Sequence, residues 1–279
     1  MEILEKSVLM DTGGTRVTKI VVRVPLVAPK AEPGQFVVVM VEESGERIPL
    51  TVVDTDKQKG TITLIFQELG FTTKLLGKLN TGDDIYAIAG PLGHAMEIKK
   101  YGKVILVGGG VGIAEIYPVA RALKNVGNHV TTILGARAKN LLILEQELKS
   151  VSDELHVATD DGSYGKKGFT TDILKELLTN DSKPSAYSLI YAVGPIPMMA
   201  KVSLTSKPYG VKTLVSLNAL MVDGTGMCGC CRVTVNKKVQ FSCIDGPEFD
   251  GNLVNWEELQ NRSKIYCKKE DHICRLEKT

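Results

Sequence analysis

One aspartate and four cysteines near the C-terminus have a spacing that suits metal ligation. The segment MVDGTGMCGCCRV, followed by FSCIDG, places Cys228, Cys230, Cys231 and Cys243 close together. The C-x4-C-x2-C pattern with a distant fourth cysteine, which binds 2Fe-2S clusters, fits Cys228, Cys231 and Cys243. The position of the first cysteine holds Asp223 instead. A carboxylate can bind iron through oxygen, so the pattern is compatible with a cluster held by one aspartate and three cysteines.

Zinc bound by the four clustered cysteines is the alternative. The adjacent Cys230 and Cys231 project differently, and structural zinc sites favour two C-x2-C pairs, so the spacing favours iron and sulfur. Outside a ligand set, Cys230 is expected to be a small packed thiol. Cys267 and Cys274, in CKKEDHIC, are expected to be structural.

The stretch VGGGVGIAE has the composition of a nucleotide-binding turn between a strand and a helix. Glycines such as Gly110 and Gly112 let the backbone approach a pyrophosphate, and the helix N-terminus supplies unpaired N–H groups. The dinucleotide fingerprint also expects an acid at the end of the next strand, where this chain has Gly135, Ala136 and Arg137. The glycines alone therefore leave tight packing as an alternative.

Two more strand ends carry residues suited to the same site. Asp160 and Asp161 close one strand in TDDGSYGKKG, and Gly194 and Pro195 close another in VGPIPMM. In a parallel sheet these ends open on the edge that binds ligands. The three turns together predict that a nicotinamide dinucleotide binds there.

The N-terminal part contains residues suited to a flavin nucleotide. They are Arg47, Pro49, Leu50 and Thr51 in ERIPLT, and Gly70, Thr72 and Thr73 in ELGFTTKLL. An arginine suits a pyrophosphate, a hydroxyl can donate or accept at an isoalloxazine edge, and a helix start can bind phosphate. Each group alone is also ordinary surface chemistry.

Three kinds of segment position these residues. Residues 1–98 contain short β-branched runs that predict an antiparallel barrel or sandwich, with turn entries between strands at Pro33–Val37 and Gly90–Gly93. Residues 99–215 alternate strands and helices, which predicts a parallel, doubly wound sheet. Residues 216–279 are rich in glycine and cysteine and form a small third unit. The expected fold class is β + α/β.

Composition limits the functions that are open to the chain. Its 279 residues are 43% hydrophobic, and 34 basic against 32 acidic side chains leave a formal charge of +2. Nucleic acid is not an expected partner, since no basic stripe is present. The N-terminus lacks an apolar stretch long enough for a signal peptide or a membrane span. We therefore expect a soluble cytoplasmic protein that does not bind membranes.

The barrel, the sheet and the cysteine segment occur in one order, and the whole chain resembles the ferredoxin-reductase-like family of electron-transfer subunits. These contain an FAD-binding barrel, an NAD(P)-binding domain and a C-terminal 2Fe-2S segment, as in the electron-transfer subunit of dihydroorotate dehydrogenase. The flavin motif of that subunit is Arg-Pro-Leu/Ile-Ser. Here Ile48 stands at the arginine position, and Arg47 lies one residue earlier, which would turn its side chain to the other face of a strand.

The resemblance implies a contact for each part of the cofactors. Thr51 would contact the isoalloxazine and Arg47 the pyrophosphate. The flavin phosphates would contact Thr72 and Thr73, and the body of the flavin would contact Ile65, Phe66 and Gln67. The nicotinamide nucleotide would contact Gly110, Gly112, Asp161 and Gly194.

One branch of this family, the small subunits of sulfide dehydrogenase, also called NADH-dependent reduced ferredoxin:NADP oxidoreductase, is similar in its ligand motif LMVDGTGMCGCCRV. The resemblance implies that Asp223, Cys228, Cys231 and Cys243 hold the 2Fe-2S cluster. It also implies an NAD(P)H-dependent oxidoreductase subunit whose chemistry rests on its cofactors. Electrons would pass between NAD(P)H, FAD, the cluster and a larger partner resembling the glutamate synthase small subunit, with a second FAD and 4Fe-4S clusters, which reacts with ferredoxin.

Two alternatives remain open from the sequence. A dihydroorotate dehydrogenase electron-transfer subunit has the same fold. The resemblance implies four cysteine ligands in that family, whereas this chain has Asp223 at the position of the first cysteine. A zinc-stabilised scaffold that senses nucleotides without redox chemistry would use the same cysteines and the same glycine turn. A flavin chromophore distinguishes the redox proteins from the scaffold.

Overall fold

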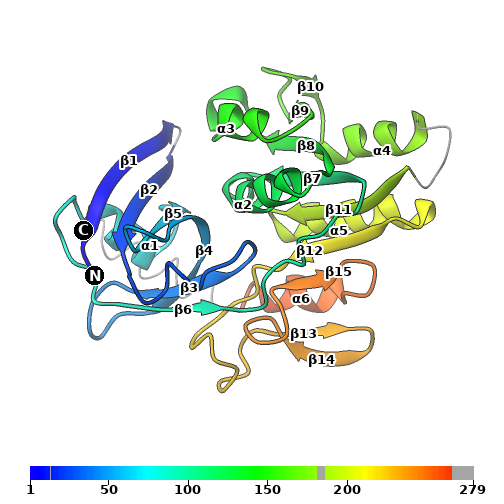
Figure 1. The fold of residues 1–279 in the computed structure, drawn as a ribbon. Helices are drawn as coiled ribbons and strands as arrows, with labels where there is room; N and C mark the ends of the chain where they lie inside the picture. Colours follow the sequence, from blue (N-terminus) through cyan, green and yellow to red (C-terminus); the bar gives the residue numbers. More distant parts are fainter. Residues whose placement is uncertain (13, 181–185, 266–279) are drawn as a thin grey trace.

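The computed structural model describes residues 1–12, 14–180 and 186–265 and divides into three connected parts (Figure 1). An antiparallel six-stranded barrel comes first, a mostly parallel seven-stranded sheet with helices follows, and a small segment with a two-stranded hairpin ends the described chain. The expected β + α/β fold class is confirmed. The boundaries at 98/99 and 215/216 stay predictions. Cys267 and Cys274 lie outside the described residues.

The barrel has the strand order β1-β2-β5-β4-β3-β6, with every neighbouring pair antiparallel. The elements are β1 (Ile3–Thr12), β2 (Thr15–Arg23), β3 (Phe36–Met40), β4 (Arg47–Asp56), β5 (Thr61–Gln67), the short helix α1 (Phe71–Lys78) and β6 (Ala87–Leu92). An antiparallel bridge between Glu2 and Asp84 brings the two edges together. The predicted turn at Gly90–Gly93 is wrong, because β6 continues through Leu92 and pairs there with Phe36.

Alternation along β3 separates the barrel core from its outer face. Val37 and Val39 pack inside the barrel, whereas Phe36 and Val38 pack in a second cluster with residues of the sheet domain and the C-terminal segment. Successive side chains of a strand point to opposite faces, so β3 is buried on both. This explains its unbroken apolar sequence FVVVM.

The sheet has the order β10-β9-β8-β7-β11-β12-β15. Its strands are β7 (Lys103–Gly109), β8 (His129–Ala136), β9 (Glu154–Thr159), β10 (Lys166–Lys167), β11 (Tyr187–Val193), β12 (Lys212–Ser216) and β15 (Glu248–Asp250). Pairing is parallel from β10 to β12 and antiparallel between β12 and β15. The order changes direction at β7, and such switch points are where ligands bind at the strands' carboxyl ends.

Helices cover both faces of this sheet. On one face, α2 (Gly112–Asn125) and α3 (Glu145–Ser150) pack against alternate side chains of β7, including Val104 and Leu106. On the other, α4 (Thr170–Asn180) and α5 (Ile196–Ser206) pack against Ile105 and Val107. Two short 3-10 helices, η1 (Lys139–Leu141) and η2 (Lys207–Tyr209), complete the layers. The alternating burial of β7 thus produces the three-layer arrangement.

The C-terminal segment joins the sheet and the barrel. It contains the hairpin β13 (Arg232–Val235) and β14 (Lys238–Phe241), then β15, and the helix α6 (Trp256–Arg262). Asn255 caps α6 by accepting a hydrogen bond from the Glu258 backbone N–H at 3.1 Å. Because β15 extends the seven-stranded sheet, the cysteine segment is fixed to the edge of this sheet (Figure 1).

Candidate cofactor-binding site

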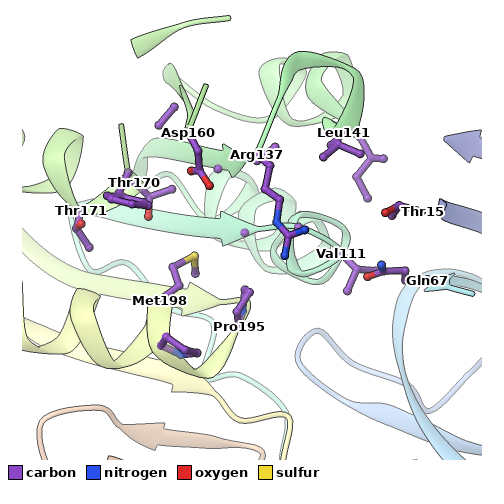
Figure 2. A pocket seen from close by; sticks show the side chains of 18 of the residues that line it. Thr15, Gln67, Val111, Arg137, Leu141, Asp160, Thr170, Thr171, Pro195 and Met198 are labelled. Atoms are coloured by element: carbon purple, nitrogen blue, oxygen red, sulfur yellow. The ribbon is translucent and has the colours of Figure 1, made fainter. Parts of the chain in front are cut away.

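A cavity of about 660 Å³ lies between the carboxyl edge of the sheet and the barrel. The ends of β7, β8 and β9 and the first turns of α4 and α5 form its sheet side, and Thr15, Val17 and Gln67 form its barrel side. Figure 2 shows Thr15 and Gln67 across from Arg137 and Val111. The cavity therefore lies where the topology of the sheet predicts a ligand.

The predicted nucleotide residues divide into two groups. Gly110, Asp160 and Pro195 line the cavity. Gly112 instead packs α2 on β11, since a Cβ there would lie 2.5 Å from the Val193 carbonyl oxygen. The Asp161 carboxylate accepts the Ser163 backbone N–H at 2.9 Å in the turn beyond, and hydrogen bonds from Ser163 lower its pKa. The structure thus brings Asp160, rather than Asp161, into the cavity wall.

Several cavity residues were not predicted from the sequence. The cavity wall contains Arg137 at the end of β8. It also contains Lys201 and Met198 from α5, and Thr170 and Thr171 from the start of α4. Arg137 extends from the end of β8 into the cavity, and Met198 points into it from α5 (Figure 2). Arg137 and Lys201 give the cavity two cationic groups for a dinucleotide's phosphates. A lysine one helical turn after VGPIP was the signal available for Lys201.

On β4 the register resolves which face Arg47 occupies. Ile48 and Leu50 pair with Val39 and Val37 and pack with the barrel core, so the alternate residues Arg47, Pro49 and Thr51 lie on the outer face. The shift of one residue therefore places Arg47 on the same face as Thr51. Ile48, at the start of the strand, is only partly buried and packs against the edge of the barrel core.

The three predicted flavin residues of β5 do not share a face. Phe66 is buried in the barrel core. Ile65 packs with the sheet domain, and Gln67 lines the cavity. Of the three, Gln67 offers its side chain to a ligand in the cavity, whereas Ile65, 5% exposed, and Phe66, 2% exposed, are both buried.

The start of α1 is tied to the start of β4. The Thr72 hydroxyl donates to Glu46 at 2.6 Å, next to Arg47. The Thr73 hydroxyl oxygen accepts the backbone N–H groups of Leu69 and Gly70, both at 3.0 Å. These bonds fix the helix start beside Arg47. They also show that the hydroxyls of Thr72 and Thr73 already have protein partners.

Two side-chain links dock α2 of the sheet domain on β4 of the barrel. The Thr51 hydroxyl donates to Glu115 Oε2 at 3.0 Å, and Arg121 donates to Asp54 at 2.6 Å. Burial raises the pKa of Glu115 to about 7, and the Thr51 hydrogen bond offsets part of that effect. An acid that titrates near neutrality thus lies beside the residue expected to contact the flavin.

The predicted cluster ligands form two pairs. The Cys231 thiol donates to Cys243 Sγ at 3.2 Å, and both residues are 2% exposed. The Asp223 carboxylate accepts the backbone N–H of Cys228 at 2.8 Å and that of Thr225 at 2.7 Å. Burial and the Cys231 thiol raise the pKa of Cys243 to about 12. Among the described residues, no three His, Cys, Asp or Glu side chains converge on one metal position.

Two pairs, rather than one convergent group, suit a binuclear cluster. Each iron of a 2Fe-2S centre takes two protein ligands, so a pair of buried thiols and an adjacent carboxylate–thiol pair have the right number and kind of donors. Zinc in a structural site would need four donors around one ion. The donor set therefore fits a 2Fe-2S cluster better than zinc.

The cluster loop also touches the barrel. A Cβ at Gly224, whose φ is +75°, would lie 2.7 Å from Val38 Cγ2 and 3.1 Å from Leu92 Cδ1. At the other end of the loop, Arg262 of α6 donates to the Cys230 carbonyl at 2.8 Å. The loop after Asp223 thus packs on the outer face of β3, the neighbour of β4, and α6 fixes its far side.

A second buried carboxyl lies between the sheet and the C-terminal segment. Burial raises the pKa of Glu248 to about 7, and the nearby Tyr191 hydroxyl and Lys212 partly offset this. Its Oε1 atom is buried without a hydrogen-bond partner in the described structure. The pKa of Tyr191, itself buried, is raised by desolvation and by Glu248.

Within the described part of the chain, no helix is both long and apolar enough to cross a membrane.

Two family models match the chain. The iron-sulfur cluster binding domain of dihydroorotate dehydrogenase B matches residues 218–255, and the oxidoreductase NAD-binding domain matches residues 106–203. The first range contains all four predicted cluster ligands, and the second contains every predicted nucleotide residue from Gly110 to Pro195.

Similar proteins cover almost the whole chain. A Thermotoga maritima homolog of the dihydroorotate dehydrogenase B (NAD(+)) electron transfer subunit is 47% identical over 271 residues, 92% of this chain and 94% of that protein. The corresponding Geobacillus thermodenitrificans subunit is 34% identical over 82% and 89% of the two chains. A chain from the structure of the NADH-dependent reduced ferredoxin-NADP oxidoreductase is 46% identical, with a TM-score of 0.89 over 97% and 95%. An Amycolatopsis cytochrome P450 reductase, 22% identical with a TM-score of 0.61 over 75% and 65%, shares the fold.

Proposed function

Because the chain belongs to the family of dihydroorotate dehydrogenase B electron-transfer subunits, we propose that it carries electrons from NAD(P)H through FAD and a 2Fe-2S cluster to a larger partner subunit. The observation that carries the proposal is the position of one barrel face. The outer face of β3 and β4 holds Thr51 against Glu115 on the sheet side and Val38 against Gly224 of the cluster loop. A flavin on this face would lie between the nucleotide cavity and the cluster.

The sheet domain binds and orients the nicotinamide nucleotide in this proposal. Gly110 opens the backbone at the end of β7, Asp160 offers a carboxylate to ribose hydroxyls, and Arg137 and Lys201 neutralise phosphates. Gly112 and Gly194 support the site by letting α2 and α5 approach the strands. Pro195 closes the wall at the start of α5.

The barrel would bind FAD along the outer face of β4 and the edge of β5. Arg47 and the start of α1 from Gly70 to Thr73 would receive the pyrophosphate, and Thr51, with Pro49, would face the isoalloxazine. Ile65 and Gln67 would flank the flavin, whereas Leu50 and Phe66 form the barrel wall behind it. When bound, the flavin accepts a hydride and releases electrons singly, which the protein controls through orientation and local charge.

The C-terminal segment would hold the cluster with Asp223 and Cys228 on one iron and Cys231 and Cys243 on the other. The hydrogen bond between Asp223 and the Cys228 backbone and the contact between the two buried thiols support this pairing. Cys230 is left outside the set, because the x4 and x2 spacing passes over it. Its backbone N–H donates to Cys228 Sγ at 3.4 Å.

The partner is a larger catalytic subunit, as the name of an electron-transfer subunit implies. We favour the type of partner found in the NADH-dependent reduced ferredoxin-NADP oxidoreductase. As the sequence resemblance implies, this partner would resemble the glutamate synthase small subunit, carry its own FAD and 4Fe-4S clusters, and react with ferredoxin. Asp223 favours it over a dihydroorotate-oxidising partner. Met227, next to Cys228 and 89% exposed, gives the cluster loop an apolar tip suited to docking.

The test is anaerobic purification of the chain with any co-purifying partner, followed by flavin, iron and zinc analysis and by absorption and EPR spectra. We expect one FAD and about two irons per chain, as a 2Fe-2S protein requires. Zinc without flavin would contradict the proposal. With both cofactors present, oxidation of dihydroorotate by the complex, without ferredoxin reduction, would favour the alternative partner.

A further inference from the structure

We infer that Glu115 exchanges the proton that accompanies electron transfer at the flavin, acting through the hydroxyl of Thr51. The inference rests on the proposed function, because it assumes a flavin on the outer face of β4. Glu115 lies in the first turn of α2, and Val111, one helical turn earlier, lines the nucleotide cavity. One short segment therefore reaches both the nucleotide and the flavin face.

The geometry provides a path for one proton. Thr51 lies on the outer face of β4 and donates its hydroxyl hydrogen to Glu115 Oε2 at 3.0 Å. The hydroxyl oxygen keeps acceptor capacity for a proton arriving from the cleft. Glu115 is partly exposed as a whole residue although its carboxyl is buried, and we infer that the proton leaves to solvent along this exposed part. A hydroxyl between a flavin and an acid can pass a proton without changing its own state.

Burial, rather than a neighbouring charge, determines the pKa of Glu115. Helix α2 packs against β4, β7, β8, β11 and α3. The cation that α2 presents to β4, Arg121, is paired with Asp54. From β11, the buried Tyr191 faces the same region, with Glu248 beyond it, and both carboxyls raise the pKa of Tyr191. Burial then sets the pKa of Glu115 near neutrality, where an acid exchanges protons most readily.

The proposed step balances in electrons and protons. NADH delivers two electrons and one proton to the flavin as hydride, and the two electrons leave singly for the cluster and the partner. The remaining flavin proton binds to the Thr51 oxygen while the Thr51 hydroxyl proton moves to the Glu115 carboxylate. Thr51 ends unchanged, and Glu115 is protonated until it releases the proton to solvent. Electron flow in the opposite direction reverses each step.

The rival explanation is a purely structural hydrogen bond that docks α2 on the barrel. Glu115→Gln separates the two, because the amide oxygen still accepts from Thr51 but cannot take up a proton. Glu147→Gln is the matched control, since Glu147 is an exposed acid on α3 away from the cleft. The readout is the midpoint potential of the bound FAD against pH, measured by spectroelectrochemistry over about two pH units on either side of neutrality.

For the wild type and Glu147→Gln we expect a break in this plot near pH 7. Below it, Glu115 is already protonated when the flavin is oxidised, so reduction draws no proton to it. Above it, Glu115 is ionised, and the negative charge gained on reduction raises its proton affinity. The potential should therefore fall more steeply with pH above the break, by the equivalent of about one further proton. In Glu115→Gln the break should disappear.

A break that persists in Glu115→Gln would overturn the inference. A second pair guards against loss of the fold or of FAD in that variant: Thr51→Ser keeps the hydroxyl and should keep the break near pH 7, whereas Thr51→Val removes the hydrogen bond that lowers the pKa of Glu115 and should move the break to higher pH. Equal curves for the Thr51 pair, with FAD bound in both, would also overturn the inference. A wild-type chain that binds no FAD, or whose FAD is not reduced by NADH, would instead contradict the proposed function.

Discussion

At the residue scale, Asp223 is the proposed oxygen ligand of the cluster in the C-terminal loop. Its carboxylate accepts two backbone N–H groups, those of Thr225 and Cys228, and these bonds lower its pKa. We expect Asp223→Cys to retain a 2Fe-2S cluster with a shifted EPR signal and potential, because a thiolate replaces an oxygen donor. Asp223→Ala should lose most of its iron. EPR spectra and iron content check both, and unchanged spectra in both variants would remove Asp223 from the ligand set.

The two adjacent aspartates after β9 provide a matched pair for nucleotide binding. Asp160 lines the cavity, whereas the Asp161 carboxylate closes the turn with Ser163. We expect Asp160→Ala to weaken NADH binding by about 1 kcal/mol, roughly fivefold, through loss of a hydrogen bond. Asp161→Ala should have a smaller effect. Calorimetric titration measures both, and a larger loss in Asp161→Ala would reverse the assignment.

We expect Glu248 to make the stability of the fold depend on pH. Its pKa is raised from its ordinary value to about 7 by burial, so its contribution to stability is fully present below the ordinary pKa and is lost as the pH rises through 7. Glu248→Gln should remove this loss and gain roughly 1–3 kcal/mol relative to wild type at alkaline pH. Denaturant unfolding at acidic and alkaline pH tests it. A wild-type–like pH dependence in the variant would exclude Glu248 as its source.

Some residue assignments depend on spacing along the chain and others on the geometry of strands and turns. The Asp223–Cys243 ligand set depends on intervals in the sequence and stays a prediction. The partition of Ile65, Phe66 and Gln67 between two faces, and the exposure of Asp160 rather than Asp161 to the cavity, depend on strand and turn geometry. Glu115 was not singled out, because its partner Thr51 is distant in sequence and on another domain.

At the scale of elements, α2 and β4 form the joint between the barrel and the sheet. The pair Asp54 and Arg121 is partly exposed, with side chains 41% and 36% accessible, so solvent weakens it. A double-mutant cycle with Asp54→Asn and Arg121→Gln should give a coupling energy of about 0.5–1 kcal/mol. Chemical unfolding of the four proteins measures it. A coupling of zero would mean that this pair contributes nothing to the joint, and that apolar packing and the Thr51–Glu115 hydrogen bond hold it.

Element order could be predicted from the alternation of strands and helices, but some boundaries and pairings could not. The glycine and proline at positions 90 and 91 indicate a turn locally, yet pairing with β3 extends β6 through Leu92. Gly112 looks like a ligand contact in the motif, but the chain needs glycine there because the backbone of α2 lies close to Val193. The joining of β15 to β12 depends on contacts between residues far apart in sequence.

At the scale of the whole molecule, the three parts share one apolar cluster. Phe36 and Val38 of the barrel, Ile105 and Val107 of the sheet, and Cys231 and Cys243 of the cluster segment all belong to it. Residues of such a cluster cannot separate without exposing buried surface, at about 25 cal/mol per Å². Sequence order predicted the three parts but not this common packing, because it arises from faces of strands that lie in different parts.

This common packing has a kinetic consequence for electron movement inside the chain. A carrier on a tethered, swinging module must diffuse between donor and acceptor, and thickening the solvent slows such a search. Here the thiols expected to ligate the cluster are rooted in the same interior as the strand beside the flavin face. We therefore expect the rate of flavin-to-cluster electron transfer, followed by flash photolysis, to be unchanged in glycerol. A rate that falls in proportion to viscosity would reveal a hinge between these parts.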